Sequence, residues 1–474
     1  MAHCKLTVHI QAVHNTVDPM RLLEVLASQS GDIAVLHSGN NGNAVLAIKP
    51  IGGVLLNVHK GQIRLHTTGI AANAGGRSEA ISSWANAWQR WGEILSGISF
   101  SRPVPEMLGW LGFISYQAGV MAELPRLYDL DNTETPLAHW QIFERYFIFN
   151  ASAQQWHLAA VHRASGSHCD MIADMQAHLH TAENSALPGK PPGKSTLLQQ
   201  PDASAFKDAV RRCREFIAAG DIYQANISAL WTVRVAEQGH KIFTRLAQNN
   251  PAQYAAFIRF GADEIVCASP ELFLKRNGTT LETRPIKGTR PRDIHSSMTD
   301  QQRCNELLNS EKDRAELAMI VDLLRNDLGR VCTHVRVEKV REIEKLPTLW
   351  HTHGIVTGEL PPQVNNGWGD IIAAMCPGGS ITGVPKIRAM EIIHELEAQS
   401  RGIYCGNIGW ISPGGDGTLN IAIRTIHIVN RIAKFRSGAG ITADSNPDEE
   451  YAEILAKASA LLRALTEQST SDVL

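Results

Sequence analysis

The chain has no long apolar run. No stretch of about 18 consecutive apolar residues occurs in its 474 residues, so the sequence predicts no membrane-spanning helix. Residues 1–15 also lack the apolar core of a secretory signal peptide, and we expect the protein to work in the cytoplasm. Sequence repeats with a period of 20–50 residues are missing too, which argues against solenoids and propellers.

The chain also carries little net charge. Its formal charge of −2 excludes a global field that would draw it to nucleic acid or to anionic lipid, so an anionic substrate must be bound by local charges. The eight cysteines form no CxxC pair and no Cys/His zinc spacing, which predicts reduced, mostly buried thiols.

Strand-like and helix-like segments alternate irregularly along the chain. Residues 1–185 are expected to form an N-terminal α+β region with short strands, among them 34–39, 43–48, 53–58 and 146–150. Residues 184–201 are rich in Pro, Gly, Ser and Lys and read as a surface connector. The remainder, 202–468, is expected to be the catalytic region. Long helices among strands joined by tight turns favour a large α+β fold with mostly antiparallel sheets.

Two predicted helices carry carboxylates at helical spacing. The helix expected to begin at Asn446–Pro447 places Glu450, Glu453 and Lys457 on one face. A solvated acidic face with a Glu→Lys pair is the plain alternative. The helix expected over 299–326 presents Asp313 and Glu316 at i, i+3, where ion pairing within residues 311–314 competes. Together the two helices could build an oxygen site for Mg²⁺.

Glycine and lysine mark the other candidate segments. The stretch 376–386 (CPGGSITGVPK) has no terminal Gly-Lys-Ser/Thr, so a nucleotide-binding P-loop is rejected and an anion beside backbone N–H groups is favoured. Gly438 and Gly440 allow close approach of a ligand, or simply form a tight turn. Lys287, in TRPIKGTRPR (283–292), could point into a cleft as a nucleophile, although a lone lysine is usually a solvated surface residue.

These segments together resemble the chorismate-utilising enzymes. The resemblance covers residues ~200–465 in family order, and more loosely GWLGFISYQAG (109–119). The matching motifs are GDIYQANIS (220–228), ASPELF (268–273), TRPIKGTRPR, SEKDRAELAMIVDLLRNDLGRV (310–331), PGGSITGVPKIRAMEII (377–393), GIYCGNIGW (402–410), NIAIRT (420–425) and GAGITADSNPDEEYAEILAKA (438–458). The resemblance implies the family fold, in which large antiparallel sheets pack face to face between flanking helices.

The resemblance also implies roles for single residues. Glu316 and Glu453 match direct Mg²⁺ ligands, and Asp313 and Glu450 match ligands that act through water. Glu271 matches the general acid that protonates the departing C4 hydroxyl of chorismate. The positions that match substrate-binding residues are Gln224, Thr289, His351, Tyr404, Arg424, Gly438, Gly440 and Lys457.

Two positions distinguish the branches of the family. Relatives that add water carry a lysine base at the place of Gln224, and an amide cannot act as a base. Anthranilate synthases usually read PIAGT where this chain reads PIKGT, the form of the aminodeoxychorismate synthases. That likeness implies attack of Lys287 on C2, loss of the C4 hydroxyl and entry of ammonia at C4, giving 4-amino-4-deoxychorismate on the way to 4-aminobenzoate and folate. Anthranilate synthase component I is the alternative.

The resemblance implies a partner as well. The chain has no glutaminase nucleophile motif of the GxCxGxQ kind, so a separate glutaminase is expected to supply ammonia. Gln117 and Val384 differ from the residues common in the family, but neither is one of the catalytic positions. The segment AVLHSG (34–39) replaces the LLES-like motif of tryptophan-binding members, which puts feedback inhibition in doubt.

Overall fold

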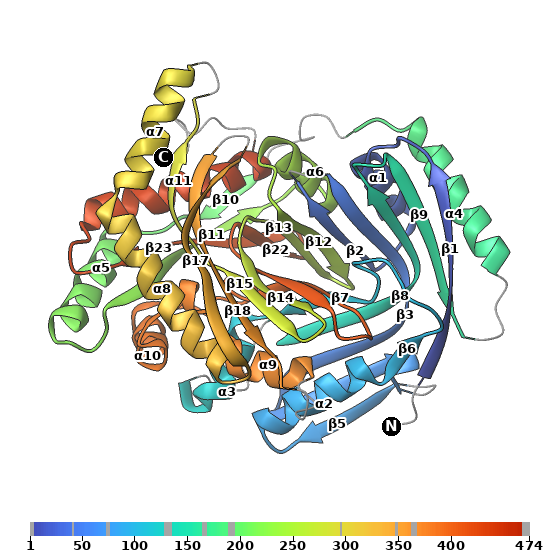
Figure 1. Ribbon diagram of the computed structural model, residues 1–474, viewed down its shortest axis with the longest axis horizontal. Helices are drawn as coiled ribbons and strands as arrows, with labels where there is room; N and C mark the ends of the chain where they lie inside the picture. Colours follow the sequence, from blue (N-terminus) through green and yellow to red (C-terminus); the bar gives the residue numbers. More distant parts are fainter. Residues whose placement is uncertain are drawn as a thin grey trace.

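The strands of the protein form two large antiparallel sheets, and helices cover their outer sides (Figure 1). The computed structural model describes residues 4–39, 42–72, 76–127, 135–163, 168–187, 195–293, 296–346, 349–361 and 367–466. Among these residues no helix is both long and apolar enough to cross a membrane.

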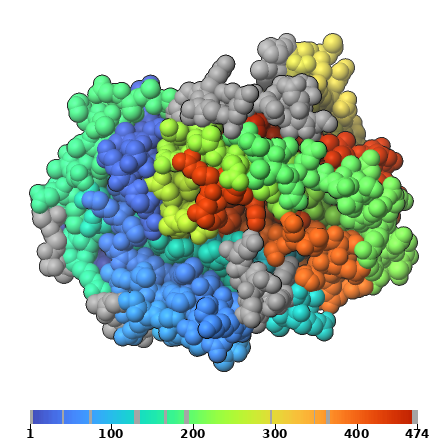
Figure 2. All heavy atoms as spheres, turned by 180° about the vertical axis from the view of Figure 1, so that it is seen from behind, coloured from blue at the N-terminus to red at the C-terminus, as the bar shows by residue number. Residues whose placement is uncertain are grey.

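The first sheet contains strands from both halves of the chain. Its order is β1 (Cys4–His14), β9 (Gln155–His162), β8 (Ala138–Asn150), β3 (Asn43–His59), β2 (Ile33–Ser38), β12 (Tyr254–Phe260), β13 (Asp263–Ser269), β22 (Thr425–Val429), β23 (Ile432–Ile441), β11 (Gln224–Arg234) and β10 (Thr196–Gln199). The pairing of β2 with β12 joins the N-terminal strands to the C-terminal ones. Figure 2 shows this as blue N-terminal atoms lying beside yellow-green ones.

The second sheet shares β3 and β8 with the first. Its order is β5 (Arg77–Ile81), β4 (Gln62–Gly69), β3, β8, β7 (Trp110–Ile114), β20 (Asn407–Ile411), β21 (Gly417–Ile421), β14 (Leu272–Asn277), β15 (Thr280–Arg284) and β18 (Leu349–Glu359), and β18 also pairs with β16 (Ile286–Pro291) and β17 (Thr333–Lys345). The β3–β8 register shifts between Pro50 and Gly52, and a bulge there bends both strands from one sheet into the other.

One apolar core lies between the sheets. It unites side chains of the first sheet, such as Val45 and Ile258, with side chains of the second, such as Phe113 and Leu419. A second apolar core fills the space between the other face of the first sheet and the helices that cover it. Both faces of the central strands of the first sheet are therefore largely buried, whereas its edge strands β1 and β10 are partly exposed.

The helices are placed as their amphipathic patterns require. Their bounds are α1 (Pro19–Gln29), α2 (Trp84–Ser96), α3 (Tyr116–Glu123), α4 (His168–Glu183), α5 (Ala203–Ala218), α6 (Gly239–Asn249), α7 (Ser297–Asn309), α8 (Glu311–Gly329), α9 (Trp368–Met375), α10 (Lys386–Leu396) and α11 (Pro447–Leu465). The Asn446 side chain caps α11 by accepting from the N–H groups of Asp448 and Glu449. The predicted start of this helix and the predicted α+β fold class are both confirmed.

Two predictions about single elements are wrong. The helix expected over 299–326 is two helices, because Ser310 ends α7 and its side chain accepts from the Asp313 N–H to cap α8. The strands expected at 43–48 and 53–58 form the single strand β3. The expected connector 184–201 contains β10, which pairs with β11, and its residues 188–194 lie outside the described residues.

Candidate active site

Lys287 points into the protein. It lies in β16, where the register with β18 shifts between Ile286 and Thr289, and the Thr352 hydroxyl donates to its backbone carbonyl. The side chain is only 17% exposed and its Nζ is 3.9 Å from the Glu316 carboxylate. The alternative of a solvated surface lysine therefore does not apply.

Glu271 lies beside this lysine. It follows β13 and is buried, and burial raises the pKa of its carboxyl. Hydrogen bonds from the Ser380 hydroxyl and the Ile286 N–H, together with the charge of Lys287, oppose that rise without cancelling it. The Glu271 carboxyl therefore retains its proton to higher pH than an ordinary glutamate.

Two glycines of β23 leave room beside Lys287. A Cβ atom on Gly440 would clash with the Gln224 amide and would lie 3.3 Å from Lys287 Nζ. A Cβ atom on Gly438 would lie 2.9 Å from the Tyr404 hydroxyl. The side-chain carbonyl of Gln224 is buried and has no hydrogen-bond partner among the described residues. A ligand donor could satisfy this acceptor.

The α8 carboxylates border the group formed by Lys287, Glu271 and Gln224, referred to below as the Lys287 cluster. Glu316 faces Lys287, and Asp313 pairs with Arg290 at 3.1 Å beside Gly288. The competing ion pair within residues 311–314 also exists, between Glu311 and Arg314, but it involves neither Asp313 nor Glu316. These two carboxylates therefore face the cluster.

The side chains of α11 are linked to β23 through Lys457. Lys457 Nζ donates to the Gly438 carbonyl at 3.1 Å and to Glu453 at 2.5 Å, so the Glu→Lys pair suggested by spacing is present. Glu450 is buried, and burial raises the pKa of its carboxyl, with the charge of Glu453 adding to the rise. A hydrogen bond from Ser445 and the charge of Lys312 in α8 partly oppose this rise.

These four carboxylates suit a divalent cation. Asp313, Glu316, Glu450 and Glu453 offer only hard oxygen donors, which Mg²⁺ prefers. Burial raises the pKa of Glu450, so its charged form is disfavoured there and a bound cation would stabilise it. Their donor chemistry therefore fits the predicted metal, although among the described residues no three of these carboxylates bring oxygens within 4.8 Å of one another.

His351 is fixed by an acidic partner. Its Nε2 lies 2.8 Å from Glu344 Oε2, and Thr289 is its register partner across β16 and β18. The ring is 4% exposed, and its charge contributes to lowering the pKa of Glu271. The hydrogen bond from His351 in turn lowers the pKa of Glu344. His351 and Thr289 thus lie at the predicted site.

Arg424 is the predicted site residue least connected to the others. Its φ of 49° is left-handed, and its backbone carbonyl accepts from the Ala268 N–H. Burial lowers the pKa of its guanidinium, and no carboxylate pairs with it among the described residues. No hydrogen bond or ion pair of those residues joins its side chain to the Lys287 cluster. A half-buried cation without a carboxylate partner favours an anionic ligand.

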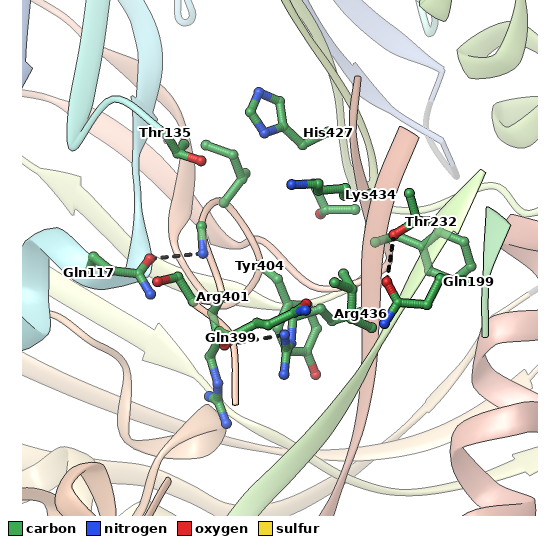
Figure 3. A pocket seen from close by; sticks show the side chains of 16 residues that line it. Gln117, Thr135, Gln199, Thr232, Gln399, Arg401, Tyr404, His427, Lys434 and Arg436 are labelled. Atoms are coloured by element: carbon green, nitrogen blue, oxygen red, sulfur yellow. Dashed lines mark hydrogen bonds between the residues drawn. The ribbon is translucent and has the colours of Figure 1, made fainter. Parts of the chain in front are cut away.

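A separate cavity of about 480 Å³ borders Tyr404 (Figure 3). Arg401 and Arg436, which line it, both pair with the buried Glu397. Tyr404 is the only predicted substrate residue among its lining residues. The cavity therefore lies beside the predicted site, with Tyr404 between it and Gly438.

Sequence reasoning missed three residues that fix the site. Ser380 reaches Glu271, Thr352 fixes Lys287 and Glu344 orients His351. Ser380 lies within the glycine-rich stretch 376–386, which did signal a functional loop. The contacts of Thr352 and Glu344 depend on the register of β18 with its neighbouring strands, which no local sequence pattern reveals.

The chain is similar to several known proteins along most of its length. The family model "chorismate binding enzyme" matches residues 60–463. Aminodeoxychorismate synthase component 1 of Bacillus subtilis (strain 168) is 37% identical over 363 residues, covering 75% of this chain and 77% of the relative. Anthranilate synthase component 1 1 of Haloarcula marismortui is 36% identical over 384 residues, covering 77% of each. The crystal structure of anthranilate synthase component I from Streptococcus pneumoniae TIGR4 aligns with a TM-score of 0.72 at 27% identity, covering 88% of this chain and 92% of that one.

Proposed function

The chain belongs to the chorismate-binding enzyme family, and from that premise we propose that it is the chorismate-aminating component I of an aminodeoxychorismate synthase. The reaction replaces the C4 hydroxyl of chorismate with an amino group and gives 4-amino-4-deoxychorismate, a precursor of 4-aminobenzoate and folate.

The observation that carries this proposal is the position of Lys287. A primary amine that is 17% exposed lies between the Glu316 carboxylate and the space above Gly440, beside a carboxyl of raised pKa. That combination provides a nucleophile and a proton donor at one place. A chain with alanine at this position has no such nucleophile.

The first step forms a bond between Lys287 and the substrate. The neutral amine attacks C2 of chorismate, the two ring double bonds shift, and the C4–O bond breaks. Glu271 donates its proton to the departing hydroxyl, which leaves as water. The raised pKa of Glu271 favours this role because the carboxyl must be protonated when the bond breaks.

The second step restores the lysine. Ammonia attacks C4, the double bonds return to their original positions, and the C2–N bond to Lys287 breaks. The Glu271 carboxylate accepts the proton that ammonia loses, so both residues return to their starting states. The buried Gln224 carbonyl is the acceptor that orients ammonia, since it has no other partner among the described residues.

Local charges select the anionic substrate. Glu316 and Glu453 would bind Mg²⁺ directly, with Asp313 and Glu450 acting through water, as the family resemblance implies. When bound, Mg²⁺ would neutralise the ring carboxylate of chorismate. The Arg424 guanidinium, which is half-buried and without a carboxylate partner among the described residues, binds the enolpyruvyl carboxylate of chorismate.

A separate glutaminase supplies the ammonia under this proposal. The relatives named component 1 imply a partner component, and the chain has no glutaminase nucleophile motif of its own. Free ammonium at high concentration should therefore replace glutamine when the purified chain is assayed alone.

The test is the identity of the product. The purified chain is incubated with chorismate, Mg²⁺ and ammonium, with and without an added aminodeoxychorismate lyase. We expect 4-aminobenzoate only in the presence of the lyase. Direct release of anthranilate and pyruvate would overturn the proposal in favour of anthranilate synthase component I.

Two lysine variants make the test specific. Lys287→Ala should abolish most of the amination because the nucleophile is lost, whereas Lys275→Ala on the neighbouring strand β14 should retain it. An adduct at Lys287, trapped by omitting ammonium and located by peptide mass spectrometry, should carry the added mass of the dehydrated substrate. Equal activity of both variants would exclude the covalent route.

A further inference from the structure

Three histidines converge on the side of the molecule opposite to α8 and α11. His9 lies on β1, His162 ends β9 and His168 begins α4, elements that lie side by side in Figure 1. One ligand nitrogen of each ring lies within 4.8 Å of the others. The register pairs Thr7 with His162, so His9 and His162 share one face of the β1–β9 ladder.

The three rings are stacked nearly parallel. The centroids of His9 and His168 are 3.4 Å apart with 5° between their planes, and those of His9 and His162 are 5.8 Å apart with 1° between them. The three side chains lie close enough for rotation of the rings to direct one nitrogen of each to a common point.

His162 is the residue that distinguishes a site from ordinary packing. Its ring is 8% exposed, and Nδ1 lies 2.6 Å from the Arg163 carbonyl. A carbonyl only accepts, so Nδ1 carries the proton and Nε2 of the neutral ring carries a lone pair. That Nε2 is buried and has no hydrogen-bond partner among the described residues.

This arrangement is typical of metal-binding histidines. Such a residue donates its other ring N–H to a backbone carbonyl or carboxylate, which fixes the tautomer and the orientation of the ring. A buried acceptor without a partner destabilises the protein unless something satisfies it. A metal ion bound at Nε2 would remove this destabilisation.

We propose that His9, His162 and His168 form a binding site for a divalent transition metal of the zinc type. Zn–N distances of about 2.0–2.1 Å require ligand nitrogens roughly 3.3 Å apart in a tetrahedral site. Rotation of His9 and His168, which are both partly exposed, brings them to the fixed His162. Solvent supplies the fourth ligand, since three imidazoles suffice for such a site.

The metal would tie three separate elements together. It would join β1 and β9 to the first residue of α4, and so fasten that helix to the first sheet. Imidazole selects zinc-type ions, whereas the carboxylates near Lys287 select Mg²⁺. The two sites therefore take different metals, and this inference does not depend on the proposed amination of chorismate.

The experiment titrates Co²⁺ into the untagged, chelator-treated full-length protein in the presence of excess Mg²⁺, which occupies the carboxylates. We expect one equivalent to bind with the intense visible bands of four-coordinate Co²⁺, and Zn²⁺ to displace it. Added Zn²⁺ should also raise the melting temperature. Absence of a stoichiometric Co²⁺ spectrum would overturn the proposal.

Matched variants locate the ion. His9→Gln and His168→Gln should each weaken binding by more than the roughly 10–100-fold typical for loss of an outer partner. His14→Gln, an exposed histidine on the same strand β1, should bind as the wild type does. Circular dichroism establishes that each variant folds. Equal affinity in all three variants would exclude this site.

Discussion

A single methyl group added at Gly440 should impair the reaction without unfolding the protein. The new Cβ would clash with the Gln224 amide and would approach Lys287 Nζ to 3.3 Å. Gly440 has no left-handed backbone conformation, so alanine is tolerated by the backbone itself. The whole effect of Gly440→Ala should therefore come from displacement of the two side chains.

The expected magnitude follows from that displacement. A shift of about 1 Å at a reacting group costs roughly 100-fold in rate, which corresponds to about 2.7 kcal/mol of activation free energy. Overpacking of a close-packed site should lower the free energy of unfolding by about 1–3 kcal/mol. We therefore expect kcat/KM to fall about 100-fold in a protein that remains folded.

The assay measures kcat/KM for chorismate at saturating ammonium, alongside urea denaturation. Gly329→Ala is the control, because a Cβ at that position meets no atom within 4 Å. In the double variant with Gln224→Ala the clash is gone, so the cost of Gly440→Ala should shrink markedly. If folded Gly440→Ala retains kcat/KM within about twofold of wild type, Lys287 and Gln224 do not border the reacting atoms.

Three other predictions concern single carboxyl groups. Glu271→Gln should lower kcat by about 10²–10⁴-fold, since the proton donor is lost. In the wild type, kcat should fall as pH rises through the raised pKa of Glu271. If the Glu271→Gln variant keeps the pH–rate profile of the wild type, Glu271 is not the proton donor. Glu453→Gln should raise the Mg²⁺ concentration needed for half-maximal activity, whereas Asp448→Asn should not; an unchanged requirement would place Glu453 outside the metal site. Glu397→Ala should lower the free energy of unfolding by about 3–5 kcal/mol, because two buried guanidiniums lose their shared carboxylate. Burial opposes the shift, but Arg401 and Arg436 lower the pKa of Glu397, so its stabilisation is present at neutral pH and should be lost as pH falls through that lowered pKa, as acid titration of unfolding would measure.

The parts of the fold that were predictable depend on local signals. Asn446 before Pro447 is a start signal that acts within one turn, and α11 begins there. Ser310 followed by Asp313 three residues later is a similar signal, and it marks the break between α7 and α8 that the apolar pattern alone concealed. In that segment the capping residue indicates the helix boundary better than the apolar periodicity does.

The site was predictable only as far as its motifs extend. Lys287 and Glu271 come together because β16 and the end of β13 meet in space, and a family resemblance was needed to pair them. Glu344 reaches His351 through the register of β17 with β18, which contains several bulges. Bulges shift register by single residues, so no spacing in the sequence reveals that contact.

Each sheet contains strands from both halves of the chain, and this limits how the gene can be divided. All the residues assigned to amination lie between positions 224 and 457, and an engineer would be tempted to express that part alone. Such a fragment would leave β12 without β2 and β20 without β7, exposing unpaired strand edges and the apolar faces behind them. Unpaired strand edges form hydrogen bonds with strands of other chains. We therefore expect truncated versions to form aggregates, and successful fusions to be built at the ends of the polypeptide.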